Sequence, residues 1–227
     1  MYKFLSFIIL IPSLCMADNV SNPDPIKLDF YSTTKFINVM KLSQGSDKSV
    51  LLFGDSIVQS LNGNDMHFDY VNLGIGGDTA SGVLNRMKGV SLGSYKSVFV
   101  SVGTNNLIMG QSGTLLGEAI SDIINYAAPK SKKIFVSEVF VPNSTINKQI
   151  PGNFASANAS IYATCAKYKN CSIIPLPKKF IGDRGLSPDM SLSDGIHLNA
   201  TAYELWKIEL NKKMADFPVN YYYRARY

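Results

Sequence analysis

The sequence predicts a three-layer α/β/α sandwich built on a five-stranded, mainly parallel β-sheet. Five short runs of β-branched or aromatic apolar residues lie between residues 50 and 176. Between them and after the last run, apolar residues recur about every 3.6 positions, as they do on one face of a helix. Strands that alternate with helices pair in parallel and carry their helices on both faces of the sheet.

Residues 1–17 are predicted to be a cleavable signal peptide. Lys3 precedes an apolar stretch from Phe4 to Leu14, and Cys15-Met16-Ala17 supplies the small residues expected before a cleavage site after Ala17. A buried N-terminal helix and a lipid anchor at Cys15 are the alternatives. The sequence therefore predicts a secreted or periplasmic protein.

Residues 18–47 are predicted to form a lead-in with one helix near Thr33 to Leu42, which packs on the domain without taking part in chemistry. The predicted strands are Val50 to Phe53, Tyr70 to Leu73, Val98 to Val102, Ile134 to Val141 and Ser172 to Leu176. The predicted helices after the lead-in are Thr79 to Met87, Gly113 to Ala128, Asn153 to Tyr168 and Ala200 to Met214. Asn199 is a good N-cap for the last of these helices.

The composition is that of an ordinary folded domain, with 46% hydrophobic and 17% charged residues. It excludes collagen-like, disordered and low-complexity proteins. Lys and Arg exceed Asp and Glu by 22 to 17, a formal net charge of +5. This excess suits peripheral contact with an anionic envelope surface, but it lacks the clustered basic face of a nucleic-acid-binding protein.

Polar clusters follow four of the predicted strands, and ligand sites in open α/β sheets lie beyond the carboxyl ends of the strands. The chain therefore brings these clusters to one edge of the sheet. They are Gly54-Asp55-Ser56, Gly74-Ile75-Gly76-Gly77-Asp78, Gly103-Thr104-Asn105-Asn106 and, after a long loop from Pro177 to Ser193, Asp194-Gly195-Ile196-His197.

Ser56 has the position of a nucleophile, because it lies on a sharp turn between a buried strand and a helix N-terminus that favours a developing anion. A serine needs a base, and the chain has only two histidines. We interpret His67 as a surface or capping residue, which leaves His197 as the base. Asp194 lies three positions before His197 and can accept its Nδ1–H; an ordinary Asp-Gly turn with a capping histidine is the alternative.

Three groups are candidate donors to an oxyanion: the backbone N–H groups of Ser56 and Gly77 and the side-chain amide of Asn105. Taken singly, a loop glycine that needs a positive φ and a turn asparagine are the more common interpretations of Gly77 and Asn105. The four clusters together favour a catalytic site.

In their order along the chain, the four blocks resemble the SGNH (GDSL-type) hydrolase family over residues 48–214. The second block is most similar to the platelet-activating-factor acetylhydrolase-like branch. The third block has Asn106 where many family members have Asp, and this branch also has that departure. The resemblance implies a flavodoxin-like domain that hydrolyses esters without metal or cofactor. It implies Ser56, His197 and Asp194 as the catalytic triad, with Ser56, Gly77 and Asn105 as the oxyanion hole.

The sequence and the resemblance together predict an exported serine esterase that acts on a short acyl group, above all O-acetyl, of a small-molecule or glycan ester. A lysophospholipase or thioesterase for longer acyl chains is the close alternative, because the loops that shape the acyl pocket cannot be predicted. An O-acyltransferase would use the same residues. A non-catalytic glycan-binding module is the remote alternative, since it has no need of all four groups.

Three further features are left open. Cys165 and Cys171 form a disulfide or remain two free thiols, and with two histidines they give no metal-ligand spacing. The loop from Pro177 to Ser193 carries Lys178, Lys179, Phe180, Arg184 and Met190, and is either a substrate contact or a solvated surface loop. The tail, residues 215–227, mixes Tyr and Arg like an interfacial anchor or is a frayed terminus.

Overall fold

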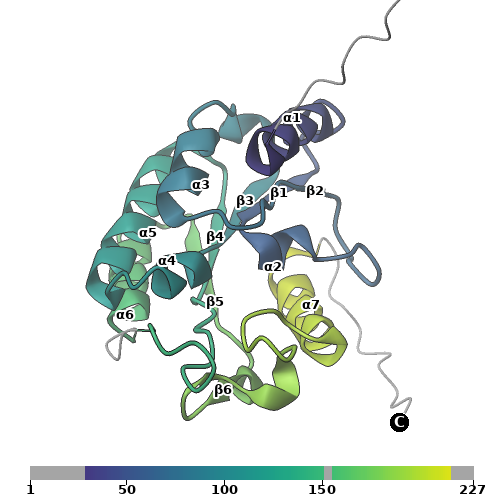
Figure 1. Ribbon diagram of the computed structural model, residues 1–227. Coiled ribbons are helices and arrows are strands. Elements are labelled where there is room, and N and C mark those ends of the chain that lie inside the picture. The colour runs from purple at the N-terminus through teal and green to yellow at the C-terminus, as the bar shows by residue number, and fades with distance from the viewer. Residues whose placement is uncertain (1–28, 151–154, 216–227) are drawn as a thin grey trace, which may run out of the picture.

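The computed structural model describes residues 29–150 and 155–215 (Figure 1). The predicted signal peptide, residues 18–28 of the lead-in and residues 216–227 of the tail lie outside the described residues. None of the helices in the described ranges combines the length and hydrophobicity that a membrane span requires.

A five-stranded sheet forms the centre of the domain, and all of its neighbouring strands are parallel. Its strand order is β2-β1-β3-β4-β5. The strands are β1 (Val50–Gly54), β2 (Tyr70–Asn72), β3 (Ser97–Ser101), β4 (Ile134–Ser137) and β5 (Cys171–Ile174). Val50 is in register with Tyr70 on one side and Ser97 on the other. The carboxyl ends of these strands therefore share one edge, as predicted.

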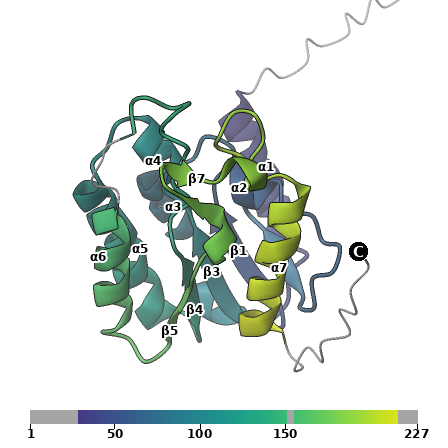
Figure 2. The ribbon, with the colours of Figure 1, turned by 90° about the horizontal axis from the view of Figure 1, so that it is seen from below.

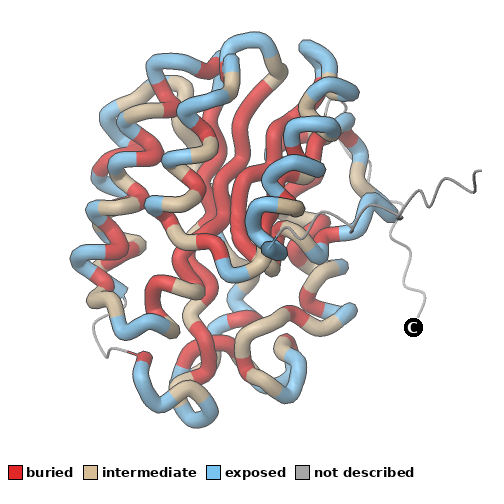
Figure 3. Tube along the Cα trace, turned by 45° about the horizontal axis from the view of Figure 1, so that its top comes forward, coloured by how far each residue is buried: buried red, intermediate tan, exposed pale blue. Residues whose placement is uncertain are grey.

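Helices cover both faces of the sheet (Figure 2), which confirms the predicted three layers. On one face lie α3 (Ala80–Met87), α5 (Gly113–Ala127) and α6 (Ala155–Cys165). On the other lie α2 (Ser56–Gln59) and α7 (Ala200–Met214). The central strands β1, β3 and β4 are buried between these layers (Figure 3), which explains their nearly continuous apolar sequences, whereas the edge strands β2 and β5 are partly exposed.

The core of the α7 face is built around Trp206, which is fully buried. Its indole ring lies against Phe99 of β3 and packs edge-on against Phe140, with ring centroids 5.1 Å apart in the second pair. Such aromatic contacts contribute on the order of 1 kcal/mol each beyond the burial of their area. They hold α7, and the loop before it, close to the carboxyl edge of the sheet.

Some element boundaries differ from the prediction. The predicted strand from Ile134 to Val141 ends at Ser137, because the N–H of Val139 donates to the Asn158 side chain rather than to a neighbouring strand. The apolar run continues as irregular, buried chain. The lead-in helix, α1 (Phe30–Leu42), begins three residues earlier than predicted, because the carboxylate of Asp29 caps it.

Two short helices begin at the carboxyl edge of the sheet. The helix predicted to start at Ser56 is α2, which has only four residues, whereas α4 (Thr104–Ile108), which begins directly after Gly103, was not predicted. Each contains one of the polar side chains that the sequence places at the carboxyl edge of the sheet. The first turns of these helices therefore fix the directions of candidate site residues.

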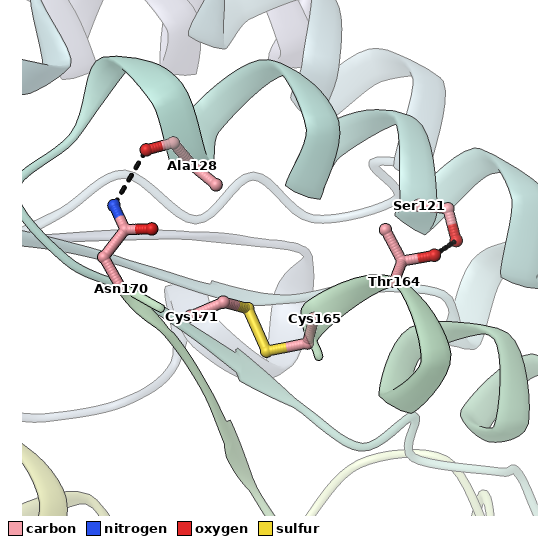
Figure 4. The surroundings of a disulfide bond; sticks show 6 residues. All are labelled: Ser121, Ala128, Thr164, Cys165, Asn170 and Cys171. Carbon is pink, nitrogen blue, oxygen red and sulfur yellow. Dashed lines mark hydrogen bonds between the residues drawn. A yellow bond between two sulfur atoms is a disulfide. The ribbon is translucent and has the colours of Figure 1, made fainter. Parts of the chain in front are cut away.

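Cys165 and Cys171 form a disulfide bond that joins the end of α6 to the start of β5 (Figure 4). Of the two alternatives left open by the sequence, the structure has the bridge. Hydrogen bonds attach the same region to α5: Ser121 Oγ lies 2.8 Å from Thr164 Oγ1, and Asn170 donates to the carbonyl of Ala128 over 2.8 Å. The bridge therefore reinforces the amino-terminal edge of the sheet, away from the carboxyl edge.

Candidate active site

Ser56 is placed by the turn that leaves β1. Asp55 caps α2 by accepting the N–H of Ile57 over 3.0 Å, so Ser56 becomes the first residue of the helix. A Cβ atom on Gly54 would collide with Val58 and with the Ser101 carbonyl. Only glycine therefore allows α2 to return so closely over the end of β1.

The structure brings Ser56, His197 and Asp194 together, although 141 residues separate the first two. Ser56 Oγ lies 2.9 Å from His197 Nε2, and His197 Nδ1 lies 2.6 Å from Asp194 Oδ2. The side chains of His197 and Asp194 are 36% and 41% exposed. These hydrogen-bonded side chains thus lie at the surface, where they are accessible without a conformational change.

Asp194 is fixed by the turn that also carries the histidine. Its Oδ1 accepts the backbone N–H groups of Ile196 and His197 over 2.8 and 3.0 Å, and Gly195 makes the turn with a φ of +65°. Partial burial opposes ionisation, but the hydrogen bonds from the side chain and backbone of His197 lower the pKa of Asp194 below its ordinary value. An ionised Asp194 retains the proton on Nδ1 and leaves the Nε2 lone pair facing Ser56.

Gly77 and Asn105 lie on adjoining loops at the same edge. The amide of Asn105 donates one N–H to the carbonyl of Asp78 over 2.9 Å, and a side-chain amide has a second N–H to donate. Gly77 is exposed with a φ of +79°, and nothing lies within 4 Å of the position that a Cβ would occupy. The backbone of this loop therefore borders open space.

Asn106, the departure from the more common Asp, supports these loops. Its Oδ1 accepts the N–H of Ala80 at the start of α3 over 3.0 Å, and its amide donates to Gln111 over 2.6 Å. The first bond needs only an acceptor, which Asn and Asp both supply. The substitution therefore keeps the contact that ties the third block to the second.

Arg86, which was not predicted as a site residue, connects the loops at this edge of the sheet. Its Nε lies 2.7 Å from Asp78 Oδ2, while the other two nitrogens donate to the carbonyls of Leu73 and Gly54 over 2.5 and 2.9 Å. The guanidinium also lies over the ring of Phe53. The Arg86 side chain therefore fixes the ends of β1 and β2 and the loop of residues 74–78, which we call the glycine loop. The only signal for this role in the sequence is the position of Arg86, eight residues after Asp78 and at the end of α3.

Asp55 belongs to the first predicted cluster, but no role of its own was predicted for it. It is fully buried, and its Oδ2 has no hydrogen-bond partner among the described residues. Burial raises the pKa of this carboxyl to about 7. The residue next to the candidate nucleophile is therefore a carboxyl group whose charge changes near neutral pH.

The remaining predicted residues have other places. His67 is exposed, as expected of a surface residue, and its backbone N–H donates to Asn211. In the loop from Pro177 to Ser193, Phe180 and Met190 are buried in the core. Lys178, Lys179 and Arg184 are exposed. Within the described ranges, no group of three or more His, Cys, Asp or Glu residues could hold a metal ion.

An apolar cavity of about 230 Å³ lies beyond the carboxyl end of β4. The walls come from the irregular chain after β4, the start of α6 and the hairpin of β6 (Ile181–Gly182) and β7 (Gly185–Leu186). Its lining includes Val139, Phe140, Leu176, Phe180, Leu186 and one carboxylate, Glu138. Thr104 donates to the carbonyl of Phe140 over 3.0 Å, so one cavity wall adjoins the helix that carries Asn105.

Comparison with known proteins gives a consistent result. Residues 52–205 match the family described as GDSL-like lipase/acylhydrolase. Platelet-activating factor acetylhydrolase IB subunit alpha2 from Gallus gallus is 29% identical over 166 residues, which cover 69% of this chain and 72% of the relative. The same subunit from Homo sapiens is 28% identical over 166 residues, with the same coverage.

Two solved structures share the fold. A GDSL-like lipase from Bacteroides thetaiotaomicron aligns with a TM-score of 0.63 and 17% identity, covering 81% of this chain and 98% of that one. A lipase/acylhydrolase from Enterococcus faecalis aligns with a TM-score of 0.60 and 19% identity, covering 72% and 93%. These two proteins therefore share the α/β fold of this chain.

Proposed function

We propose that this chain, which belongs to the GDSL-like lipase/acylhydrolase family and is a serine ester hydrolase, removes short acyl groups, above all O-acetyl, from carbohydrate. The observation that carries the proposal is the hydrogen-bonded chain from Ser56 Oγ through His197 to Asp194. It lies beside backbone and amide donors, an arrangement suited to acyl transfer.

In the proposed reaction, Ser56 Oγ attacks the acyl carbon as His197 Nε2 takes its proton. The negative charge moves to the former carbonyl oxygen, which accepts hydrogen bonds from the N–H groups of Ser56 and Gly77 and from the Asn105 amide. His197 then donates its proton to the leaving alcohol, and the acyl group stays on Ser56. Water, deprotonated by His197, attacks this ester. The bond between the acyl carbon and Ser56 Oγ breaks, His197 returns the proton to Ser56, and the acid is released. Asp194 orients the imidazole and stabilises its positive charge.

The preference for a small acyl group and a bulky alcohol rests on the exposure of the site. More than a third of the His197 and Asp194 side chains is exposed, and the backbone at Gly77 faces open space. An open site of this kind accommodates an alcohol as large as a sugar chain. It offers little apolar surface to hold an extended acyl chain, which needs an enclosed apolar cavity.

A lysophospholipase or thioesterase is the second candidate, because of the apolar cavity next to α4. The lining of this cavity is mainly apolar, which suits a fatty acyl chain. To reach this cavity, the chain would extend from Ser56 past the loop of Asn105 to the hairpin of β6 and β7. The first proposal needs no such path.

Turnover of p-nitrophenyl esters with acyl chains from two to twelve carbons separates the two candidates. We expect kcat/KM to be highest for acetyl or butyryl and to fall as the chain lengthens. A preference for eight carbons or more would favour the second candidate, and its loss in a Leu186→Trp variant, which fills the cavity, would locate the acyl chain. Ser56→Ala is the inactive control, and a fluorophosphonate probe should label the wild-type protein at Ser56 alone.

Export is part of the same proposal. It is supported by the signal-peptide pattern of residues 1–17 and by the Cys165–Cys171 bridge, since disulfides persist mainly in oxidising compartments. Mass spectrometry of the protein recovered from periplasm or medium should find a chain that begins at Asp18. Recovery of the intact chain from the cytosol alone would contradict export.

A further inference from the structure

Helix α1 has the reverse of the usual amphipathic orientation. A surface helix normally turns its apolar stripe toward the core and its polar face toward water. In α1 the buried residues are Thr34 and Asn38. The amide of Asn38 donates to the carbonyl of Leu73 and the ammonium of Lys41 to that of Asn72, both over 3.1 Å. Polar side chains therefore hold the helix at the β2 edge of the sheet (Figure 1).

Most apolar side chains of α1 face outward, although Leu42 at its end packs against the core. Phe36, Val39 and Met40 are 60%, 58% and 45% exposed, and their spacing of three and four positions puts them on one side of the helix. With the neighbouring exposed residues they form what we call the α1 face: Phe30, Phe36, Ile37, Val39 and Met40. Isolated apolar residues are normal on a protein surface, whereas a contiguous set marks a contact with another apolar surface.

Basic residues outnumber acidic ones around the α1 face, although Asp29 caps the helix beside Phe30 and Arg86 is paired with the buried Asp78. Between Phe30 and Leu42 the only charged residues are Lys35 and Lys41, and between Ala80 and Lys88 they are Arg86 and Lys88. Lys35 is exposed and, with Val39, lines a groove of about 150 Å³. Phe53, Leu73 and Ile75 form part of the lining of this groove. An exposed ammonium beside apolar walls matches a molecule with an anionic head and a hydrocarbon body.

The α1 face also adjoins the catalytic edge. The ring of Phe30 lies 3.5 Å from the position that a Cβ would occupy on Gly76, the neighbour of Gly77. The side chain of Tyr31 lies close to the carboxyl group of Asp78 on the same loop. A surface that contacted the α1 face would therefore lie close to the oxyanion donors.

We propose that the α1 face docks this protein on the surface of a bilayer that contains anionic lipids. The exposed apolar side chains would enter the boundary between head groups and acyl chains, while Lys35 would contact anionic head groups. The docking itself is independent of the ester substrate, and it does not rest on the proposed hydrolysis. Its consequence is that the catalytic edge is held at a membrane surface.

Flotation with vesicles tests this proposal on the full chain. The vesicles contain equal parts of phosphatidylglycerol and phosphatidylcholine, or phosphatidylcholine alone. The variant Phe36→Ser/Val39→Ser/Met40→Ser removes the centre of the α1 face. The control Leu115→Ser/Ile181→Ser removes two exposed apolar side chains elsewhere. All of these proteins carry the same residues 1–28, so differences in binding report the α1 face.

We expect the triple variant to lose about tenfold or more of the partition coefficient on the anionic vesicles and the control to bind like the wild type. Lys35→Glu should weaken binding to the anionic vesicles and reduce its dependence on salt. Ser56→Ala should float as the wild type does, whatever its activity, so a failure of the proposed hydrolysis stays separate from a failure of docking.

Other occupants of the α1 face give different results. Equal flotation of the wild type and the triple variant would overturn the proposal. A wild-type dimer that does not float and becomes monomeric in the triple variant would replace the bilayer with a second copy. A wild type that does not float and a triple variant with a lower thermal midpoint would assign the face to a segment of the same chain, which also overturns the proposal.

Discussion

The guanidinium of Arg86 lies 2.7 Å from the carboxylate of Asp78, and the two side chains are only 7% and 2% exposed. Removal of one member of a buried ion pair leaves an uncompensated charge, which costs about 3–5 kcal/mol. We therefore expect Arg86→Met to lower the free energy of unfolding in urea by that amount. It should also reduce kcat, because the glycine loop loses its attachment to β1 and β2.

The double variant Arg86→Met/Asp78→Asn is the matched control, since it removes both charges. It should be more stable than Arg86→Met alone, although the loop contacts stay broken. If Arg86→Met lost less than about 1 kcal/mol, the pair would behave like an exposed one, and its role as the support of the loops would be wrong.

Asn105→Ala tests the amide donor. Loss of one donor to an oxyanion lowers kcat by about 10²–10³-fold, and a bond formed only in the transition state leaves KM little changed. The same change removes the hydrogen bond to the Asp78 carbonyl, which we expect to cost about 1 kcal/mol of stability. Steady-state kinetics and urea unfolding of the same preparation separate the two effects. A variant with normal kcat would exclude Asn105 from the oxyanion hole.

Asp55 predicts how stability depends on pH. Burial raises its pKa in the folded state to about 7, above that of the unfolded chain, so the folded state holds the proton more strongly. Its contribution to stability is therefore fully present below about pH 4, declines as the pH rises toward 7, and is constant above that. Asp55→Asn keeps an acceptor for the N–H of Ile57 and removes the titration.

Urea unfolding of the wild type and Asp55→Asn at about pH 4 and pH 8 measures this contribution. Between these two values, we expect the wild type to lose roughly 2–4 kcal/mol more stability than the variant. Other titrating groups affect both proteins alike and cancel in the comparison. Parallel curves for the two proteins would show that Asp55 ionises at its ordinary pKa.

The disulfide should contribute to stability and not to turnover. A bridge between cysteines six positions apart restricts the unfolded chain by about 2 kcal/mol. Cys165→Ser/Cys171→Ser should therefore unfold at lower urea concentration, while kcat stays normal, because the bridge lies at the amino-terminal edge of the sheet. Dithiothreitol should destabilise the wild type and leave the double variant unchanged. A loss of kcat at low temperature would contradict this separation.

The sequence predicted most features that depend on residues close together in the chain. The strands could be located from their apolar runs, and parallel pairing then brought Ser56, Asn105 and His197 to one edge. Arg86 could not be assigned, because its partners are backbone carbonyls 13 and 32 residues away, which leave no pattern in the sequence. The end of β4 depends on the side chain of Asn158 from another element. The outward face of α1 was missed, since periodicity shows that a helix has two faces but not which one is buried.

The nucleophile and the base of the proposed site come from opposite ends of the domain. Ser56 follows the first strand, whereas His197 lies in the last loop, 141 residues later. During synthesis, a chain that has emerged only as far as residue 190 holds the serine without its base. With the proposed roles of Ser56 and His197, the nucleophile therefore acquires its base only when almost the whole domain has been made and folded. The proposed mechanism then leaves a nascent or shortened chain without activity toward esters.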